Sequence, residues 1–254
     1  MGYVFIAISA LSYSFMSIFV KLAGDELATI QIVFVRGVLT LFFTYIILIK
    51  KKIPPLGNNR KVLFIRGLVG SIALFFVYDS LQRFSLPEAT VIQYLYPIFT
   101  ALFAGMIISE QITKKIYLSI IFGLLGVYII LDFPFSKIEA VPQLDIIIAL
   151  SGAGLTGFSY VMVKKASNLQ ESPYVIMFYF PLFTVPLSML FLTGNWVMPS
   201  KLIWVYLIMV GISSQFGQIF LTYGYEILPA SKAAVTSYLQ VPFSVIAGII
   251  IFND

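Results

Sequence analysis

Apolar residues run along the chain in blocks of about 20, and short segments rich in Lys, Arg, Asp and Glu separate the blocks. At a rise of about 1.5 Å per residue, a helix of this length crosses a hydrocarbon core of about 30 Å. A helix also satisfies its own backbone hydrogen bonds in lipid. The pattern therefore predicts an all-α integral membrane protein with nine spans, at residues 2–20, 29–49, 62–84, 88–108, 115–132, 144–163, 173–193, 202–225 and 231–252.

The overall composition agrees with a membrane location. Hydrophobic residues make up 60% of the chain and charged residues 11%, with a mean hydropathy of +0.99. Soluble globular domains carry about 25% charged residues. The chain has no Cys and no His, which excludes disulfides, thiol chemistry and the common metal sites. We therefore expect no metal and no other cofactor.

Basic residues fall unevenly between the loops on the two sides of the membrane. Counted from a cytoplasmic N-terminus, the odd loops hold four: Lys21, Arg83, Lys137 and Lys201. The even loops hold ten: Lys50, Lys51, Lys52, Arg60, Lys61, Lys114, Lys115, Lys164, Lys165 and Lys232. The positive-inside rule places the richer side in the cytoplasm. We expect a multi-pass protein of the cell membrane, the bacterial inner membrane, with a cytoplasmic N-terminus and no nucleic-acid partner.

The chain contains an internal repeat. Shifted by 144 residues, "SLPEATVIQYLYPIFTALFAGMIISE" (Ser85–Glu110) lies over "PASKAAVTSYLQVPFSVIAGIIIFND" (Pro229–Asp254). The same shift aligns residues of the preceding helix, and a shift of 143 places "SFMSIFVK" (Ser14–Lys21) over "GFSYVMVK" (Gly157–Lys164). Three matches in the same order, at nearly one offset, indicate a duplication.

The repeated unit holds five predicted helices, and an odd number makes the second copy enter the membrane from the opposite side. We expect two inverted repeats, residues 1–133 and 144–254, which is an architecture of secondary transporters. Two complete copies need ten helices, and nine are present. The first copy has a helix after Glu110 and the second has none after Asp254. We therefore expect the complete protein to continue past Asp254 with a tenth span.

Several motifs carry a family resemblance. Each repeat has an Ala-rich helix start, then "YLYP" (Tyr94–Pro97) or "YLQVP" (Tyr238–Pro242), then a small, apolar run that ends in Glu or Asp. "SPYVIMFYFPLF" (Ser172–Phe183) and "TYGYEILPASKAAVTSYL" (Thr222–Leu239) add to the pattern. On these motifs the whole chain resembles the EamA-type members of the drug/metabolite transporter superfamily. The resemblance implies transport of small organic metabolites, often amino acids and related compounds, or of drugs, without nucleotide hydrolysis.

Two other classes stay open as alternatives, an integral-membrane enzyme and a channel. Without His, an enzyme lacks the usual base and metal ligand, and only Asp79 among the carboxylates lies deep in a predicted span. No ring of charges or filter-like loop indicates a channel. We expect no enzymatic activity, and a secondary transporter that works by alternating access around a midplane cavity. Its expected partners are a small-molecule substrate and the lipid bilayer, with a homodimer left open.

Two prolines fall near the middle of corresponding spans. Pro97 and Pro242 each remove a backbone hydrogen bond and should kink their helices. Paired interruptions of this kind indicate a transporter site, with helix packing as the alternative. Polar residues that we expect to line the cavity, or else to form hydrogen bonds between helices, are Gln93, Tyr94, Tyr96, Gln215, Gln218, Tyr238 and Gln240.

Two ionisable residues, Arg36 and Asp79, lie well inside predicted spans. An unpaired charge at the centre of a span costs roughly 2.5–3.5 kcal/mol, so we expect pairing or contact with water. The alternatives are a structural ion pair between the two, a site for a charged substrate group or a coupling proton, and snorkelling. Arg66, which is nearer the cytoplasmic edge, is interpreted as a snorkelling anchor.

Overall fold

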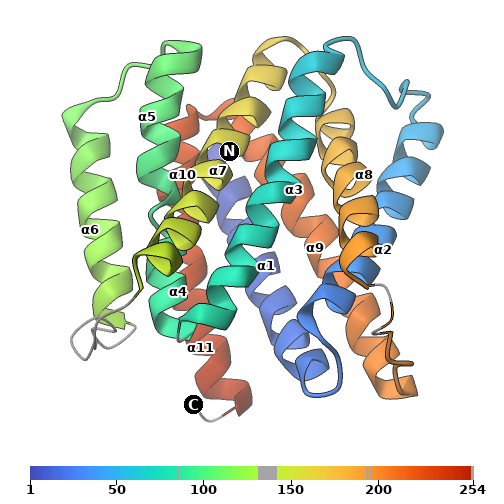
Figure 1. The fold of residues 1–254 in the computed structure, drawn as a ribbon. Helices are drawn as coiled ribbons and strands as arrows, with labels where there is room; N and C mark the ends of the chain where they lie inside the picture. Colours follow the sequence, from blue (N-terminus) through green and yellow to red (C-terminus); the bar gives the residue numbers. More distant parts are fainter. Residues whose placement is uncertain (85, 131–141, 193, 195, 253–254) are drawn as a thin grey trace.

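The structure of the chain is a computed structural model that describes residues 1–84, 86–130, 142–192, 194 and 196–252. Lys137, the repeat boundary at residue 133 and the chain end at Asp254 lie outside the described residues. Figure 1 shows a bundle of helices. They are α1 (Gly2–Gly24), α2 (Thr29–Lys50), α3 (Arg60–Arg83), α4 (Leu86–Gln93), α5 (Tyr96–Ile108), α6 (Lys114–Ile130), α7 (Gln143–Asn168), α8 (Pro173–Leu192), α9 (Lys201–Ile227), α10 (Ala230–Thr236) and α11 (Gln240–Phe252).

Every predicted span coincides with one helix or with two consecutive helices. Seven segments of the described chain are long and apolar enough to cross a membrane, and the predicted all-α membrane fold is confirmed. The helices α7 and α9 are longer than their predicted spans, with 26 and 27 residues. Each continues beyond its apolar block, α7 through Lys164 and Lys165 and α9 through Glu226, so helical structure extends past the hydrocarbon core.

The fourth and ninth predicted spans are each broken into two helices. In the fourth, α4 ends at Gln93 and α5 begins at Tyr96, with Pro97 in the first turn of α5. In the ninth, a 3₁₀ turn separates α10 from α11, and Pro242 lies in the first turn of α11. Proline has no N–H to give to the carbonyl four residues earlier, so each break falls where the helical hydrogen bonding is already incomplete.

Helices pair across the two predicted repeats. The helix α1 packs chiefly on α9, α3 packs chiefly on α7, and α2 packs on α8. In a duplicated chain α1 corresponds to α7, α2 to α8 and α3 to α9. The α1–α9 and α7–α3 contacts are therefore the same contact made once by each repeat. Figure 1 shows that corresponding helices run in opposite directions: α1 descends while α7 rises, and α3 descends while α9 rises. An inverted duplication produces this arrangement.

The outer surface of the bundle is apolar, and the interior contains many small residues. Large side chains such as Phe42, Phe122 and Ile250 are more than half exposed, as expected of helices that face lipid. Inside, a Cβ added at Gly157 of α7 would lie 2.8 Å from the backbone nitrogen of Thr100. Glycine at this position therefore allows α5 and α7 to approach closely.

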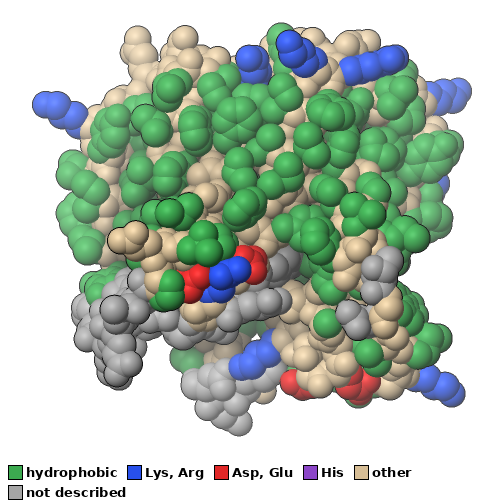
Figure 2. Space-filling model, viewed as in Figure 1, with side chains coloured by type: hydrophobic (Ala, Val, Ile, Leu, Met, Phe, Trp, Pro, Cys, Tyr) green, Lys and Arg blue, Asp and Glu red, His purple; other side chains and the backbone are tan. Residues whose placement is uncertain are grey.

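One end of the bundle is rich in lysine. Figure 2 shows Lys and Arg side chains along one edge of the molecule, above a broad apolar band. We call this edge the lysine-rich end, and it holds the residues of the predicted even loops, Lys50, Lys51, Lys52, Arg60, Lys61, Lys114, Lys115, Lys164, Lys165 and Lys232. The other edge, which holds Lys21, Arg83 and Lys201, is called the opposite end.

Candidate functional site

The two broken helices meet through a pair of equivalent tyrosines. The Tyr238 hydroxyl donates a hydrogen bond of 3.0 Å to the carbonyl oxygen of Tyr94. Their rings lie 5.8 Å apart between centroids, and both residues are buried. An unbroken helix would occupy the Tyr94 carbonyl with the N–H four residues later, but that N–H, of Ile98, donates to Leu95 instead. The break therefore leaves the Tyr94 carbonyl without its helical donor, and the Tyr238 hydroxyl of the second repeat takes the donor's place.

A chain of aromatic rings continues from this contact into the bundle. The Tyr96 ring lies 6.2 Å from the Tyr94 ring and 5.4 Å from the Tyr160 ring of α7. The Tyr160 ring lies 5.3 Å from that of Tyr225 on α9. The structure thus brings together Tyr94, Tyr96 and Tyr238 of the predicted site and adds two tyrosines that the sequence analysis did not select. Nothing in the sequence around Tyr160 or Tyr225 indicates a site, because single tyrosines in apolar helices are common.

The predicted glutamines lie in different places. Gln93 donates to the Thr156 hydroxyl of α7 at 3.3 Å, close to the break between α4 and α5. Gln215 is buried against Thr44 of α2, with its Nε2 3.0 Å from the threonine hydroxyl. That contact joins α2 to α9 within the apolar interior, as interhelical hydrogen bonding requires. Gln240 is half-buried at the start of α11, and its backbone carbonyl accepts a 3.2 Å hydrogen bond from the Ser14 hydroxyl.

Gln218 belongs to the central part of the bundle. Its Oε1 accepts a 2.7 Å hydrogen bond from the Tyr13 hydroxyl of α1, and its Nε2 is buried without a partner among the described residues. The structure therefore places Gln218 beside Tyr13 of α1, whereas Gln215, only three residues earlier on α9, points toward α2.

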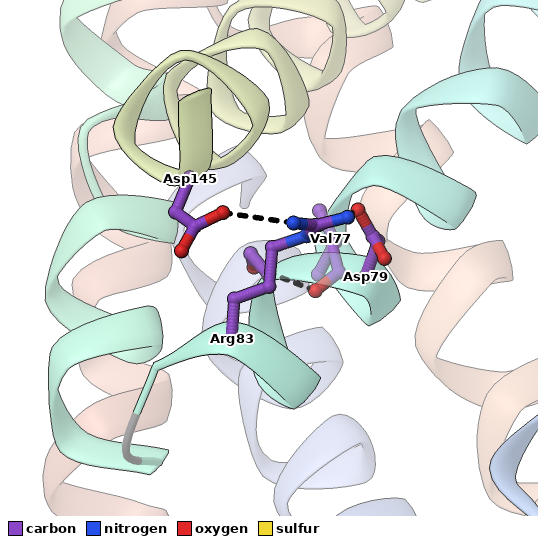
Figure 3. A network of polar contacts seen from close by, with 5 residues as sticks. Val77, Asp79, Arg83 and Asp145 are labelled. Carbon is purple, nitrogen blue, oxygen red and sulfur yellow. Dashed lines mark hydrogen bonds and ion pairs between the residues drawn. The ribbon is translucent and has the colours of Figure 1, made fainter. Parts of the chain in front are cut away.

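Asp79 does not pair with Arg36. Figure 3 shows the Arg83 side chain between Asp145 of α7 and Asp79 of α3. The two ion pairs both measure 2.8 Å. The Asp79 side chain is 42% exposed, so it is not the deeply buried carboxylate that the sequence predicted. The cause is local, because Arg83 follows Asp79 by one helical turn, and both lie close to the opposite end of the bundle.

Arg66, which the sequence analysis interpreted as a snorkelling anchor, lies inside the protein. The residue is 3% exposed, and its Nη1 donates a 2.7 Å hydrogen bond to the Ser159 hydroxyl of α7. The guanidinium lies over the Phe180 ring, 5.0 Å from the centroid. Gly70, one turn later, leaves the space that this group occupies, since an added Cβ would overlap Arg66. A snorkelling anchor would reach the lipid interface, whereas Arg66 points into the protein.

Carboxylates at the lysine-rich end cap helices of the other repeat. Glu110, which follows α5, accepts from the backbone N–H of Ala230 at 2.7 Å at the start of α10. Glu171, between α7 and α8, accepts from the backbone N–H of Asn58 at 2.8 Å, before the start of α3. A negative charge at a helix N-terminus is favourable because it meets unpaired N–H groups and the positive end of the helix dipole. These bonds hold the two repeats together at this end.

Two surface cavities accompany these features. One, of about 270 Å³, lies between α6 and the α10–α11 break and is lined in part by Gly123, Tyr238 and Pro242. The other, of about 440 Å³, lies at the lysine-rich end beside Glu171 and Glu226. Within the described ranges, no group of three or more acidic side chains is placed to hold a metal ion.

Comparisons with known proteins agree with the fold. The chain is 24% identical over 245 residues to a pseudopaline exporter of Pseudomonas aeruginosa, covering 96% of this chain and 84% of the relative. It is 28% identical over 267 residues to solute carrier family 35 member G1 of Homo sapiens, covering 100% and 73%. It is 26% identical over 265 residues to an S-adenosylmethionine uptake transporter of Rickettsia prowazekii, covering 100% and 85%.

A solved structure and a family profile complete the comparison. A crystal structure of another protein superposes with a TM-score of 0.84 at 16% sequence identity, covering 98% of this chain and 88% of that one, which shows a shared fold. The profile of the EamA-like transporter family matches residues 1–132 and residues 143–254. The two matches together take in nearly the whole chain, and the protein belongs to the EamA-like transporter family.

Proposed function

We propose that this protein is a secondary transporter that moves small organic metabolites, amino acids or related compounds, or drugs, by alternating access between its two repeats. The relatives support the general class, because they include an exporter and an uptake transporter of small molecules. The substrate passes near the middle of the membrane, where α4 and α5 and the α10–α11 pair are broken.

The observation that carries the proposal is the contact between the two breaks. Tyr94 and Tyr238 are separated by the 144-residue repeat offset, and they meet through one hydrogen bond, in helices that both contain a proline at the break. Broken spans place free backbone groups inside the membrane, and such groups are tolerated where they line a cavity or are covered by protein. The breaks therefore mark both a binding region and a pair of hinges.

Polar contacts between the repeats supply the two gates. At the lysine-rich end these are the caps that Glu110 makes on α10 and Glu171 makes before α3. At the opposite end, Gln31 of α2 donates a 2.6 Å hydrogen bond to the backbone carbonyl of Val197, which precedes α9. A typical hydrogen bond contributes about 0.5–1.5 kcal/mol net, so a few such bonds can be broken at one end and formed at the other.

The orientation follows from the lysines. With the lysine-rich end in the cytoplasm of a bacterial cell, the N-terminus is cytoplasmic and the Arg83 network faces outward. The residues that we assign to the substrate region are Gln93, Tyr94, Tyr96, Gln218, Tyr238 and Gln240, with Pro97 and Pro242 at the hinges.

Counterflow in proteoliposomes tests the proposal. Full-length protein is reconstituted into liposomes, and the liposomes are loaded with one unlabelled compound at a time. A trace amount of the same compound, labelled, is then added outside. The compounds come from a panel of amino acids and amphipathic drugs. We expect saturable, transient accumulation for at least one compound, and none with empty liposomes. Linear, non-saturable flux would favour a channel. Chemical conversion of the compound would favour an enzyme. No counterflow for any compound, with protein that remains monodisperse, would contradict the proposal.

A further inference from the structure

Three unpaired hydrogen-bond groups are buried in one part of the bundle. The structure leaves Arg66 Nε, Gln218 Nε2 and the Tyr225 hydroxyl without partners among the described residues. Arg66 and Tyr225 interact electrostatically, and both Arg66 and Gln218 act on Tyr13. A guanidinium N–H and an amide N–H can only donate, whereas a phenol can donate or accept, so at least two of the three groups are donors. This part of the bundle therefore has buried donors in excess of acceptors.

A second cation lies beside the same tyrosines. Arg36 of α2 is half-buried, and its guanidinium forms no hydrogen bond or ion pair with any residue that the structure describes. Its charge acts on Tyr13 and on Tyr160, and so does the charge of Arg66. At about 1.5 Å per residue, Arg36 lies roughly 10 Å inside α2 from the opposite end, and Arg66 lies roughly 9 Å inside α3 from the lysine-rich end. The two arginines therefore belong to opposite halves of the bundle along its axis, and both act on the same two tyrosines.

In the part of the chain that the structure describes, no carboxylate pairs with either arginine; the charge of Glu110 acts on Tyr225, but its oxygens bind backbone N–H groups at the start of α10. Asp79 and Asp145 bind Arg83, and Glu110 and Glu171 cap helices. Each carboxylate with a described side chain is thus engaged elsewhere or exposed near a helix end: Asp25, Glu26, Asp79, Glu110, Asp145, Glu171 and Glu226. A buried cation such as Arg66 is costly without a counter-ion, even when it has a neutral hydrogen-bond partner. An anionic ligand would offset that cost.

We propose that Arg36 and Arg66, with Tyr13, Gln218 and Tyr225, form a binding site for the carboxylate of a small organic anion or zwitterion. The inference rests on the proposed transport function and names the chemical class of its substrate. A carboxylate has two acceptor oxygens and matches the donors of a guanidinium, which bind it through charge-assisted hydrogen bonds.

The position of the two arginines suits a carrier. Arg36 meets a carboxylate that enters from the opposite end, and Arg66 meets one that enters from the lysine-rich end. Tyr13 and Tyr160 lie within the electrostatic reach of both arginines. The same anionic group can therefore remain paired with a cation while access changes from one side to the other, which avoids an unpaired charge in the apolar interior.

Ligand-induced thermal stabilisation of the purified full-length protein in detergent tests the site. The probes are matched acid and amide pairs: succinate and succinamide, benzoate and benzamide, L-leucine and L-leucinamide. Inorganic phosphate is included as a separate probe. A ligand that binds only the folded state raises the unfolding temperature in a saturable way. We expect at least one carboxylate to do so while its amide does not. Stabilisation by amides as strong as by acids, by phosphate alone, or by none of the probes would overturn the inference.

Substitutions then assign the effect to the two arginines. Arg36→Gln and Arg66→Gln should each weaken carboxylate binding by about ten- to hundredfold, because each removes a charge-assisted contact. Arg83→Gln is the matched control, since it removes an arginine already paired with Asp79 and Asp145, and it should leave binding unchanged. If Arg66→Gln does not fold, Arg66→Lys keeps the charge, and the half-buried Arg36 still provides a test. Unchanged binding in Arg36→Gln would contradict the site.

Transport and binding can fail separately. Carboxylate binding that is lost in Arg36→Gln, combined with absent counterflow, would contradict the transporter and keep the site. Saturable counterflow of cationic or neutral compounds, with no carboxylate binding, would contradict the site and keep the transporter.

Discussion

At the scale of single residues, two arginines on the same helix have different environments. Arg83 near the end of α3 binds two carboxylates and is partly exposed, whereas Arg66 near the start of α3 is buried beside Ser159 and Phe180. The first pairing follows from spacing, because residues four apart share one face of a helix. The second joins residues 93 positions apart in the chain. Sequence spacing could have predicted the contact of Arg83 with Asp79 but not the place of Arg66.

The exposure of Asp79 leads to a prediction about proton coupling. Asp79→Asn leaves Arg83 bound to Asp145, and a partly exposed ion pair contributes little to stability. We expect the unfolding temperature to change by no more than about 2 °C, and any uptake that a pH gradient drives in the wild type to stay within about twofold. Thermal unfolding in detergent and uptake into proteoliposomes with an imposed pH gradient measure the two quantities. Loss of gradient-driven accumulation with exchange retained at equal pH would instead identify Asp79 as the coupling carboxylate.

At the scale of helices, sequence reasoning locates the spans well and their interruptions approximately. Length and apolar content determine where a helix can cross the membrane, so the predicted spans and the observed helices coincide. The prolines mark the broken spans, but the breaks themselves lie a few residues earlier, at Tyr94–Leu95 and Ser237–Leu239. The reason is that a proline fits the first turn of a helix, where its missing N–H has no partner to lose, so the irregular residues precede it.

The hydrogen bond between the breaks gives a second prediction. Tyr238→Phe removes the donor and leaves the Tyr94 carbonyl buried without it, which should cost about 0.5–1.5 kcal/mol of stability. We also expect slower counterflow, because the hinge contact is lost. Tyr94→Phe is the control for stability, since the bond uses the backbone of Tyr94 and not its hydroxyl. Equal unfolding temperatures for Tyr238→Phe and Tyr94→Phe would show that this bond contributes nothing.

At the scale of the whole molecule, the lysine distribution predicts which end faces the cytoplasm. The chain has no cysteine, so single cysteines report without background. A cysteine in the variant Lys51→Cys should resist an impermeant maleimide added to intact cells, and one in Lys201→Cys, at the start of α9 on the opposite end, should react. Both positions are exposed, so access differs only by side. Labelling of Lys51→Cys before permeabilisation would reverse the orientation.

The bond between Tyr238 and Tyr94 also makes the two repeats chemically unequal at the point where they meet. The donor belongs to the second repeat and the acceptor to the first, and the duplication supplies no reciprocal bond of this geometry among the contacts described. If only one of the two access states keeps a bond of about 1 kcal/mol, the populations of the two states differ about fivefold. A duplicated fold can thus favour one access state at rest because of a single phenol, without any ion gradient.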